Sequence, residues 1–284
     1  MIEPATATIT TPDGAADVRG MLRHITEAKR LQALTLVREG RLYDLGRVLD
    51  ESAPVFPGRY FRQTLVTTAH HANTAMPVGE NDVNWITEVF SATTQLGTHL
   101  DSLGHLQMGG RGYGGLTVSQ LASASGLTNL GAETIPQIVT RGLLVDVAPL
   151  SSGAVIGIEA VADLDPEPGD AVFFHTGWGA RWNDAAAYLS GEPGPGMQVA
   201  SWLAGRGVAL TGCDTWSYGP VPAEDPARPF AVPQHLNIEH GVFVVENLDL
   251  SALAADGVRE FALVLTFPKL RGATGAWTSP IALV

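Results

Sequence analysis

The sequence lacks the residues that several classes of site require. Cys213 is the only cysteine among 284 residues, so neither an intrachain disulfide nor a cysteine-rich zinc site can form. Lysine and arginine number 17 against 29 aspartates and glutamates, and the net charge of −12 leaves no basic stripe to neutralise phosphates. We therefore expect no nucleic-acid partner, and any metal must bind histidine, carboxylate and amide groups.

Long apolar segments are also missing. No stretch approaches the roughly 18 consecutive apolar residues of a membrane-spanning helix, and the first twenty residues contain no basic region followed by an apolar run. Hydrophobic residues make up 45% and charged residues 16%, a balance typical of globular proteins. These features predict a soluble cytoplasmic protein with no membrane partner.

The patterning predicts a short arm followed by one α/β domain. Residues 1–20 are rich in Thr, Ala, Pro and Asp without periodicity, and are predicted to form a loose N-terminal arm. Residues 21–284 are predicted to be a single domain, because the Gly- and Pro-rich segments 191–196 and 219–233 resemble loops rather than linkers. Apolar spacing over residues 17–38 predicts one helix or two short ones, and strand-like runs then alternate with helical patterns.

Candidate ligands are concentrated in the segment QLGTHLDSLGH, residues 95–105. On an extended strand His99 and Asp101 point to one face, and Gln95, four residues before His99, joins them there. Such a group suits a divalent cation, whereas His105, beyond a glycine, is placed to carry a proton. The alternative is that these are ordinary polar residues of strands and loops, with Asp101 capping a helix. That alternative does not explain why four polar side chains are concentrated in one segment of so apolar a chain.

Two other catalytic classes find no support in the sequence. The glycine-rich segment 109–115 lacks the order needed for dinucleotide binding. No G-x-S-x-G motif occurs, which disfavours a nucleophilic serine.

QLGTHLDSLGH resembles the HxGTHxDxPxH signature of the metal-dependent cyclase and kynurenine formamidase family, which includes isatin hydrolase. Four more segments resemble that family in the same order: YDLGRVLDESAPVFPG, EPGDAVFFHTGW, GCDTW and HGVFVVENLDLSAL. The resemblance implies a mixed β-sheet core with flanking helices, of the swivelling β/β/α type. It also implies that Gln95, His99 and Asp101 bind the metal and that His105 is the catalytic acid or base.

Two departures from the signature bear on the metal. Gln95 replaces a histidine with a neutral oxygen donor, which favours Mn²⁺ over Zn²⁺, although Zn²⁺ stays possible. Leu103 replaces a proline without removing a chemical group. The resemblance places further ligands at Gln234 and Glu246, with His235 as a substitute for Gln234. For Glu246 a salt bridge is the alternative to metal binding. The number of metal ions, one or two, is left open.

The remaining candidates concern the substrate. Phe56, Trp85, Trp216 and Tyr218 are predicted to line an apolar substrate wall, with core packing as the alternative for each. Asp214, in GCDTW, is predicted to contact the substrate, with orienting a ligand or holding the fold as the alternatives.

Together these features predict a metal-dependent hydrolase that cleaves a cyclic or N-formyl amide, or a lactone, of a small aromatic substrate. A non-hydrolytic cyclase or dehydratase is the second interpretation, and a metal-poor binding protein on the same fold is the third. The apolar strands and the resemblance also predict a homodimer or homotetramer that shares pocket residues.

Overall fold

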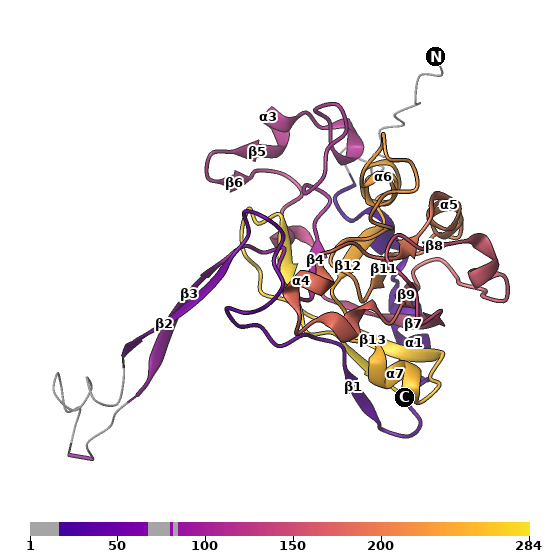
Figure 1. Cartoon of the computed structure of the whole chain (residues 1–284), viewed down its shortest axis with the longest axis horizontal. Helices are drawn as coiled ribbons and strands as arrows, with labels where there is room; N and C mark the ends of the chain where they lie inside the picture. Colours follow the sequence, from indigo (N-terminus) through magenta and orange to yellow (C-terminus); the bar gives the residue numbers. More distant parts are fainter. Residues whose placement is uncertain (1–16, 68–79, 82–84) are drawn as a thin grey trace.

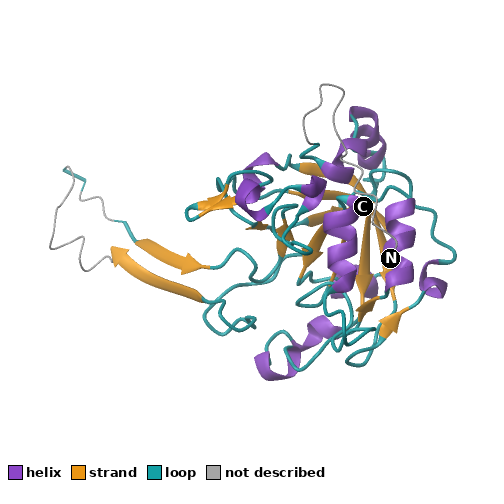
Figure 2. Cartoon of the chain, turned by 90° about the horizontal axis from the view of Figure 1, so that it is seen from above, coloured by secondary structure: helices purple, strands orange, loops and turns teal. Residues whose placement is uncertain are grey.

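The computed structural model describes residues 17–67, 80–81 and 85–284. A mixed sheet of nine strands lies at its centre, in the order β1-β15-β13-β7-β9-β11-β12-β4-β14, and short helices cover it (Figures 1 and 2). The predicted α/β architecture with a mixed sheet core and flanking helices is confirmed. The sheet strands are β1 (Leu42–Asp44), β4 (His99–Asp101), β7 (Ile138–Asp146), β9 (Ala171–His175), β11 (Leu210–Cys213), β12 (Phe243–Glu246), β13 (Glu260–Leu265), β14 (Gly275–Trp277) and β15 (Ile281–Leu283).

The other elements are short. The remaining strands are β2 (Phe61–Thr67), β3 (Thr87–Ala92), β5 (Ala122–Ser123), β6 (Gly126–Leu127), β8 (Val155–Ile156) and β10 (Gly194–Pro195). The α-helices are α1 (Glu27–Leu34), α3 (Val118–Leu121), α4 (Ala185–Tyr188), α5 (Met197–Gly205), α6 (Ala231–Gln234) and α7 (Ser251–Ala255). The 3-10 helices are η1 (Gly20–His24), η2 (Tyr113–Gly115), η3 (Ala132–Thr134), η4 (Ile158–Val161) and η5 (Trp178–Arg181), and η6 (His235–Glu239) is a π-helix.

Parallel pairing dominates the middle of the sheet. β7, β9, β11 and β12 run parallel, and every residue of β9, β11 and β12 except the last of β9 is buried. Continuous apolar runs such as AVFF and FVV fit this position, because a parallel strand is covered on both faces. β4 joins the edge of β12 in antiparallel register, so the QLGTHLDSLGH segment lies against the end of β12.

The N-terminal segment departs from the predicted loose arm at its last residues. Residues 1–16 lie outside the described part, but Asp17 and Gly20 are buried and the amide of Met21 donates to the carbonyl of Gly241. The helix predicted over residues 17–38 is formed as two short ones, η1 and α1. Among the described residues, no helix is long and apolar enough to cross a membrane.

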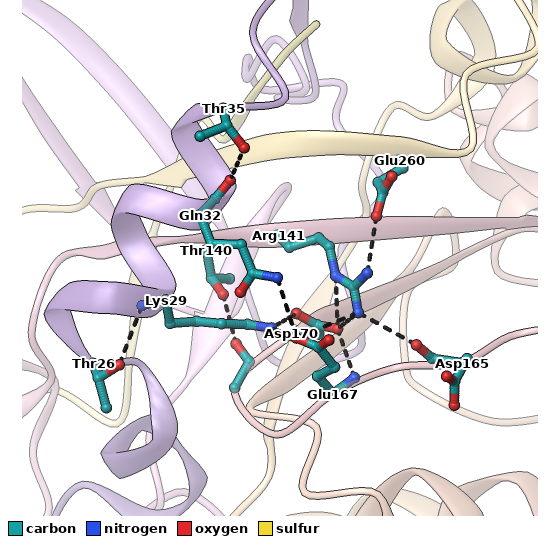
Figure 3. Close-up of polar contacts among 11 residues, drawn as sticks. Thr26, Lys29, Gln32, Thr35, Thr140, Arg141, Asp165, Glu167, Asp170 and Glu260 are labelled. Carbon is teal, nitrogen blue, oxygen red and sulfur yellow. Dashed lines mark hydrogen bonds and ion pairs between the residues drawn. The ribbon is translucent and has the colours of Figure 1, made fainter.

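One face of α1 is attached to the sheet by a buried charge network (Figure 3). The Thr26 hydroxyl caps the helix by accepting from the amide of Lys29, whose side chain is buried. Lys29 Nζ lies 2.6 Å from one oxygen of Asp170, and Arg141 Nη2 lies 2.5 Å from the other. Asp170 is fully buried, yet each of its oxygens faces a cation that compensates its charge.

The hairpin of β2 and β3 projects away from the rest of the molecule (Figures 1 and 2). The strands pair from Phe61↔Ala92 to Thr67↔Thr87. Apolar side chains are exposed along it and just before β3, namely those of Leu65, Val66, Trp85, Ile86, Val89 and Phe90. A two-stranded hairpin is marginally stable by itself. We call this hairpin, residues 61–67 and 85–92, the arm.

Candidate metal centre and pocket

His99 is held with one ring nitrogen aimed at two carboxylates. Its side chain is fully buried, and Nδ1 lies 2.7 Å from the carbonyl oxygen of Gly97. A carbonyl only accepts hydrogen bonds, so Nδ1 carries the proton and Nε2 presents its lone pair. Nε2 faces Glu246 at 3.2 Å and Asp101 at 3.6 Å.

The two carboxylates reach His99 by different routes. Asp101 follows His99 by two residues on β4, so the two side chains share one face of the strand. Glu246 ends β12 and lies directly opposite His99 in the antiparallel register, which places it on the same face. His99, Asp101 and Glu246 offer ligand atoms that all lie within 4.8 Å of one another.

The electrostatics of this group suit a cation. Buried His99 Nε2 and Asp101 Oδ1 both lack a hydrogen-bond partner among the described residues. Burial raises the pKa of Glu246, with the charge of Asp101 adding to it, although the nearby His99 ring opposes the rise. Burial also disfavours a charged His99, but the closeness of Glu246 and the charges of both carboxylates outweigh it and raise the pKa of His99. Two carboxylates and one imidazole nitrogen are donors that bind divalent ions, so the residues fit a metal.

Gln95 reaches this region, but not along a strand as the sequence predicted. β4 begins only at His99, and Gly97 has a φ of +55°, which interrupts the extended backbone. The amide nitrogen of Gln95 donates to the Thr274 hydroxyl at 2.9 Å. A Cβ added to Gly275 would lie 2.7 Å from Gln95 Nε2 and 3.5 Å from Asp101 Oδ1, so this glycine leaves room for both side chains.

A pocket of about 190 Å³ opens over the carboxylates. Asp101, Glu246 and His105 line it, and His105 Nε2 lies 4.0 Å from Asp101 Oδ1. His105 is 22% exposed at its side chain, whereas His99 is fully buried. The histidine predicted to carry a proton is therefore the one that a substrate in the pocket can contact.

Part of the pocket wall is aromatic. The ring of Trp216 lies 5.5 Å from that of Phe56 and 6.5 Å from that of Phe230, and all three line the pocket. Arg59 also lines it, with its guanidinium over the Phe56 ring and donating to the carbonyl of Gln95. The pocket therefore has an apolar wall, the basic group of Arg59 and an acidic side formed by Asp101 and Glu246.

Other predicted site residues lie elsewhere. Trp85 is exposed on the arm, before β3, and does not line the pocket. Asp214 is buried, and its oxygens accept from the Thr176 amide and hydroxyl and from the Gly179 amide. These contacts hold the end of β9 and leave no side-chain oxygen directed at the pocket. Tyr218 is buried and lines a neighbouring cavity of about 220 Å³.

Neither Gln234 nor His235 is brought to the His99 group. The amide nitrogen of Gln234 donates to the carbonyl of Gln107 at 3.1 Å. His235 contacts Ser201 on α5 through Nε2 and Glu239 through Nδ1, so its ring is directed away from the pocket. In this part of the chain, Phe230 at the N-cap of α6 and Pro233 within α6 line the pocket instead.

Sequence reasoning missed Arg59, Phe230 and a buried support beneath the pocket. The fully buried carboxylate of Glu192 accepts from the Ser217 hydroxyl at 2.5 Å and from the amides of Trp216 and Ser217. It thereby fixes the turn that carries Trp216. The length of the loop around Phe230 was the only signal for any of these residues, since the contacts join distant segments.

Comparisons with known proteins identify the chain's relatives. A solved structure described as a novel cyclase matches with a TM-score of 0.84 and 26% identity over 94% of each chain. Isatin hydrolase A from Ralstonia solanacearum matches with a TM-score of 0.63 and 20% identity, over 86% of this chain and 92% of that one. A predicted metal-dependent hydrolase from Bacillus stearothermophilus gives 0.60 and 18%, over 86% and 98%.

A search of curated proteins found no match. The family model described as putative cyclase matches residues 43–220, which is more than half of the chain and includes His99, Asp101 and His105. The chain therefore belongs to the putative cyclase family.

Proposed function

We propose that this protein is a metal-dependent hydrolase that cleaves a cyclic or N-formyl amide, or a lactone, of a small aromatic substrate. One observation carries the proposal: a buried imidazole nitrogen and two carboxylates converge beside a pocket that also exposes His105. The structural neighbours described as isatin hydrolase and as a predicted metal-dependent hydrolase support the same reaction class.

The chain's own residues divide the work. When bound, a divalent ion supplies positive charge that polarises a carbonyl and acidifies a water. His105 takes the proton of the attacking water and returns it to the leaving nitrogen or oxygen, and the nearby charge of Asp101 stabilises the imidazolium formed in between. Hydrolysis of either bond creates a carboxylate, for which Arg59 provides a positive charge in the same pocket.

The aromatic wall argues for the kind of substrate. Phe56, Trp216 and Phe230 offer ring faces that stack on a flat, apolar substrate, and aromatic pairs of this kind stabilise by about 0.5–1.5 kcal/mol beyond simple burial. The pocket of about 190 Å³ limits this substrate to a small molecule.

The test is an assay of metal-loaded protein against formanilides, cyclic imides and lactones. His105→Ala should lower kcat by about 10²–10⁴-fold while the metal content stays at the wild-type level. His24→Ala, which alters a histidine of η1, serves as the matched control and should leave kcat unchanged. Loss of metal from His105→Ala would instead make His105 a ligand, and a dehydrated or ring-closed product would support a cyclase.

We also propose that the protein is a homodimer or homotetramer assembled through the arm. Six exposed apolar side chains on a projecting hairpin would be covered by a second copy, since closed symmetric pairs are the commonest oligomers. Val89→Glu combined with Ile86→Glu should give a monomer by light scattering, whereas Glu88→Gln on the same hairpin should not. A monomeric wild-type protein would contradict the proposal.

A further inference from the structure

A second group of side chains able to bind a metal lies beyond α6, where η6 supplies two residues and its C-cap supplies the third. His235, Glu239 and His240 offer ligand atoms that lie within 4.8 Å of one another. His235 Nδ1 lies 2.8 Å from a Glu239 oxygen, and the rings of His235 and His240 are 4.5 Å apart. None of these residues lines the pocket described above.

The π-helix explains why three groups meet on one turn. Hydrogen bonds from residue i to i+5 widen the turn, so residues four and five apart both lie above residue i. An α-helix would bring Glu239 over His235 but turn His240 away. The wider turn adds a second imidazole to what would otherwise be an ordinary helical ion pair.

An ion pair alone accounts for only part of this arrangement. An exposed ion pair between residues i and i+4 stabilises a helix only weakly and needs no third group. The two imidazoles lie edge to face at an interplanar angle of 73°, so their nitrogens approach one region from different directions. Two histidines and one carboxylate, open to solvent at Glu239, match a three-ligand zinc site that keeps one position for water.

We propose that His235, Glu239 and His240 form a second divalent-cation site, with a preference for Zn²⁺, separate from the His99 group. η6 follows directly on α6, and both Pro233 within α6 and Phe230 at its N-cap line the pocket. A cation bound across η6 would therefore brace the segment that holds this part of the pocket wall.

The test is Zn²⁺ stoichiometry and affinity of the full chain by competition with a chromogenic chelator. Wild-type protein should bind two equivalents, His240→Gln one, and Asp101→Asn one. Glu239→Gln should weaken the second equivalent at least tenfold. His24→Gln is the matched control and should keep both equivalents.

The two sites are distinguished by which variant loses metal. If His240→Gln and Glu239→Gln both bind Zn²⁺ with wild-type stoichiometry and affinity, the second site does not exist. If Asp101→Asn keeps both equivalents while His240→Gln loses one, the inference stands and the His99 assignment fails. Because His240 and Glu239 are not fully buried, their replacement leaves the core intact, and far-ultraviolet circular dichroism of each variant checks this.

Discussion

Two buried acidic groups of this protein differ in how their charge is compensated. Asp170 has Lys29 on one oxygen and Arg141 on the other, both within 2.6 Å (Figure 3). Asp101 and Glu246 face the ring nitrogen of His99 at 3.6 and 3.2 Å, and Asp101 also lies 4.0 Å from His105, but among the described residues no lysine or arginine pairs with either acid. Burying an uncompensated charge is costly. The Asp170 group is compensated by the chain itself and is here called complete, whereas the Asp101–Glu246 group is incomplete and would be stabilised by an added cation. A buried acid thus points to a ligand only when the chain itself supplies no counter-charge.

The largest expected effect comes from removing a carboxylate from the incomplete group. Asp101→Asn keeps the shape but removes one negative charge, so metal retention on dialysis and turnover should both be lost. In metal-free protein the same change relieves repulsion with Glu246, so the free energy of unfolding should stay equal or rise. Stoichiometric metal in the variant, measured by elemental analysis, would refute the assignment.

Removing a cation from the complete Asp170 group should lower stability and leave metal binding unchanged, the opposite of the effect expected for Asp101→Asn. Lys29→Met leaves Asp170 with one cation, and removing one partner of a buried ion pair costs about 3–5 kcal/mol of unfolding free energy. Metal content of the folded protein should not change. Arg206→Met, which breaks an exposed pair with Asp165, is the control and should cost about 0–1 kcal/mol in urea denaturation. Equal losses in the two variants would remove the distinction.

Glu192 extends the comparison to an acid held by hydrogen bonds alone. Burial raises its pKa well above the ordinary value of 4.5. Between the pKa of the unfolded state and that of the folded state, the folded protein therefore keeps a proton that the unfolded protein releases. The contribution of Glu192 is therefore fully present below about pH 4.5 and is lost as pH rises through the folded pKa.

The measurement is the difference in unfolding free energy between wild type and Glu192→Gln, followed by denaturation as pH rises. This difference should fall by about 1.4 kcal/mol per pH unit between the pKa of Glu192 in the unfolded state and its pKa in the folded state, because glutamine does not titrate. The hydrogen bonds lost in the variant add a constant offset and do not alter this slope. A difference independent of pH would show that the ionised form is compensated.

The smallest effect concerns metal choice. One imidazole nitrogen and two carboxylates form an oxygen-rich donor set, so Mn²⁺ should restore more activity to metal-free protein than Zn²⁺ at equal occupancy. Gln95→His adds a nitrogen donor beside Asp101 and should reverse this order by severalfold. Better recovery of the native protein with Zn²⁺ would indicate that Gln95 is not a ligand.

The sequence was most informative where a site depends on neighbouring residues. His99 and Asp101 share a strand face because they are two residues apart, and that spacing is visible in the sequence. The placement of Gln95 on the same strand was predicted wrongly, because the sequence did not show that Gly97 takes a positive φ and interrupts the extended backbone.

Contacts between distant segments were harder to predict from the sequence. Glu246 meets His99 through the register of β12 with β4, which no local pattern specifies, and only the family resemblance pointed to it. The richness in β-branched and apolar residues predicted strands at residues 64–70 and 85–95, where the arm forms β2 and β3 at 61–67 and 87–92; residues 68–70 lie outside the described part. This richness could not reveal that the two strands leave the sheet, which depends on pairing partners. The same limit hid Arg59 and Glu192.

The aromatic wall has a consequence for how this protein could diversify. Phe56 lies on the loop before β2, and Trp216 and Phe230 lie on the connection between β11 and α6, whereas His99, Asp101 and Glu246 lie on adjacent strands of the sheet. A loop substitution can reshape the wall without shifting the strand register that aligns the acidic residues. Selection for a new substrate can therefore act on the three aromatic positions independently of the chemistry, and a library randomised only there should alter which ring systems are accepted while metal binding persists.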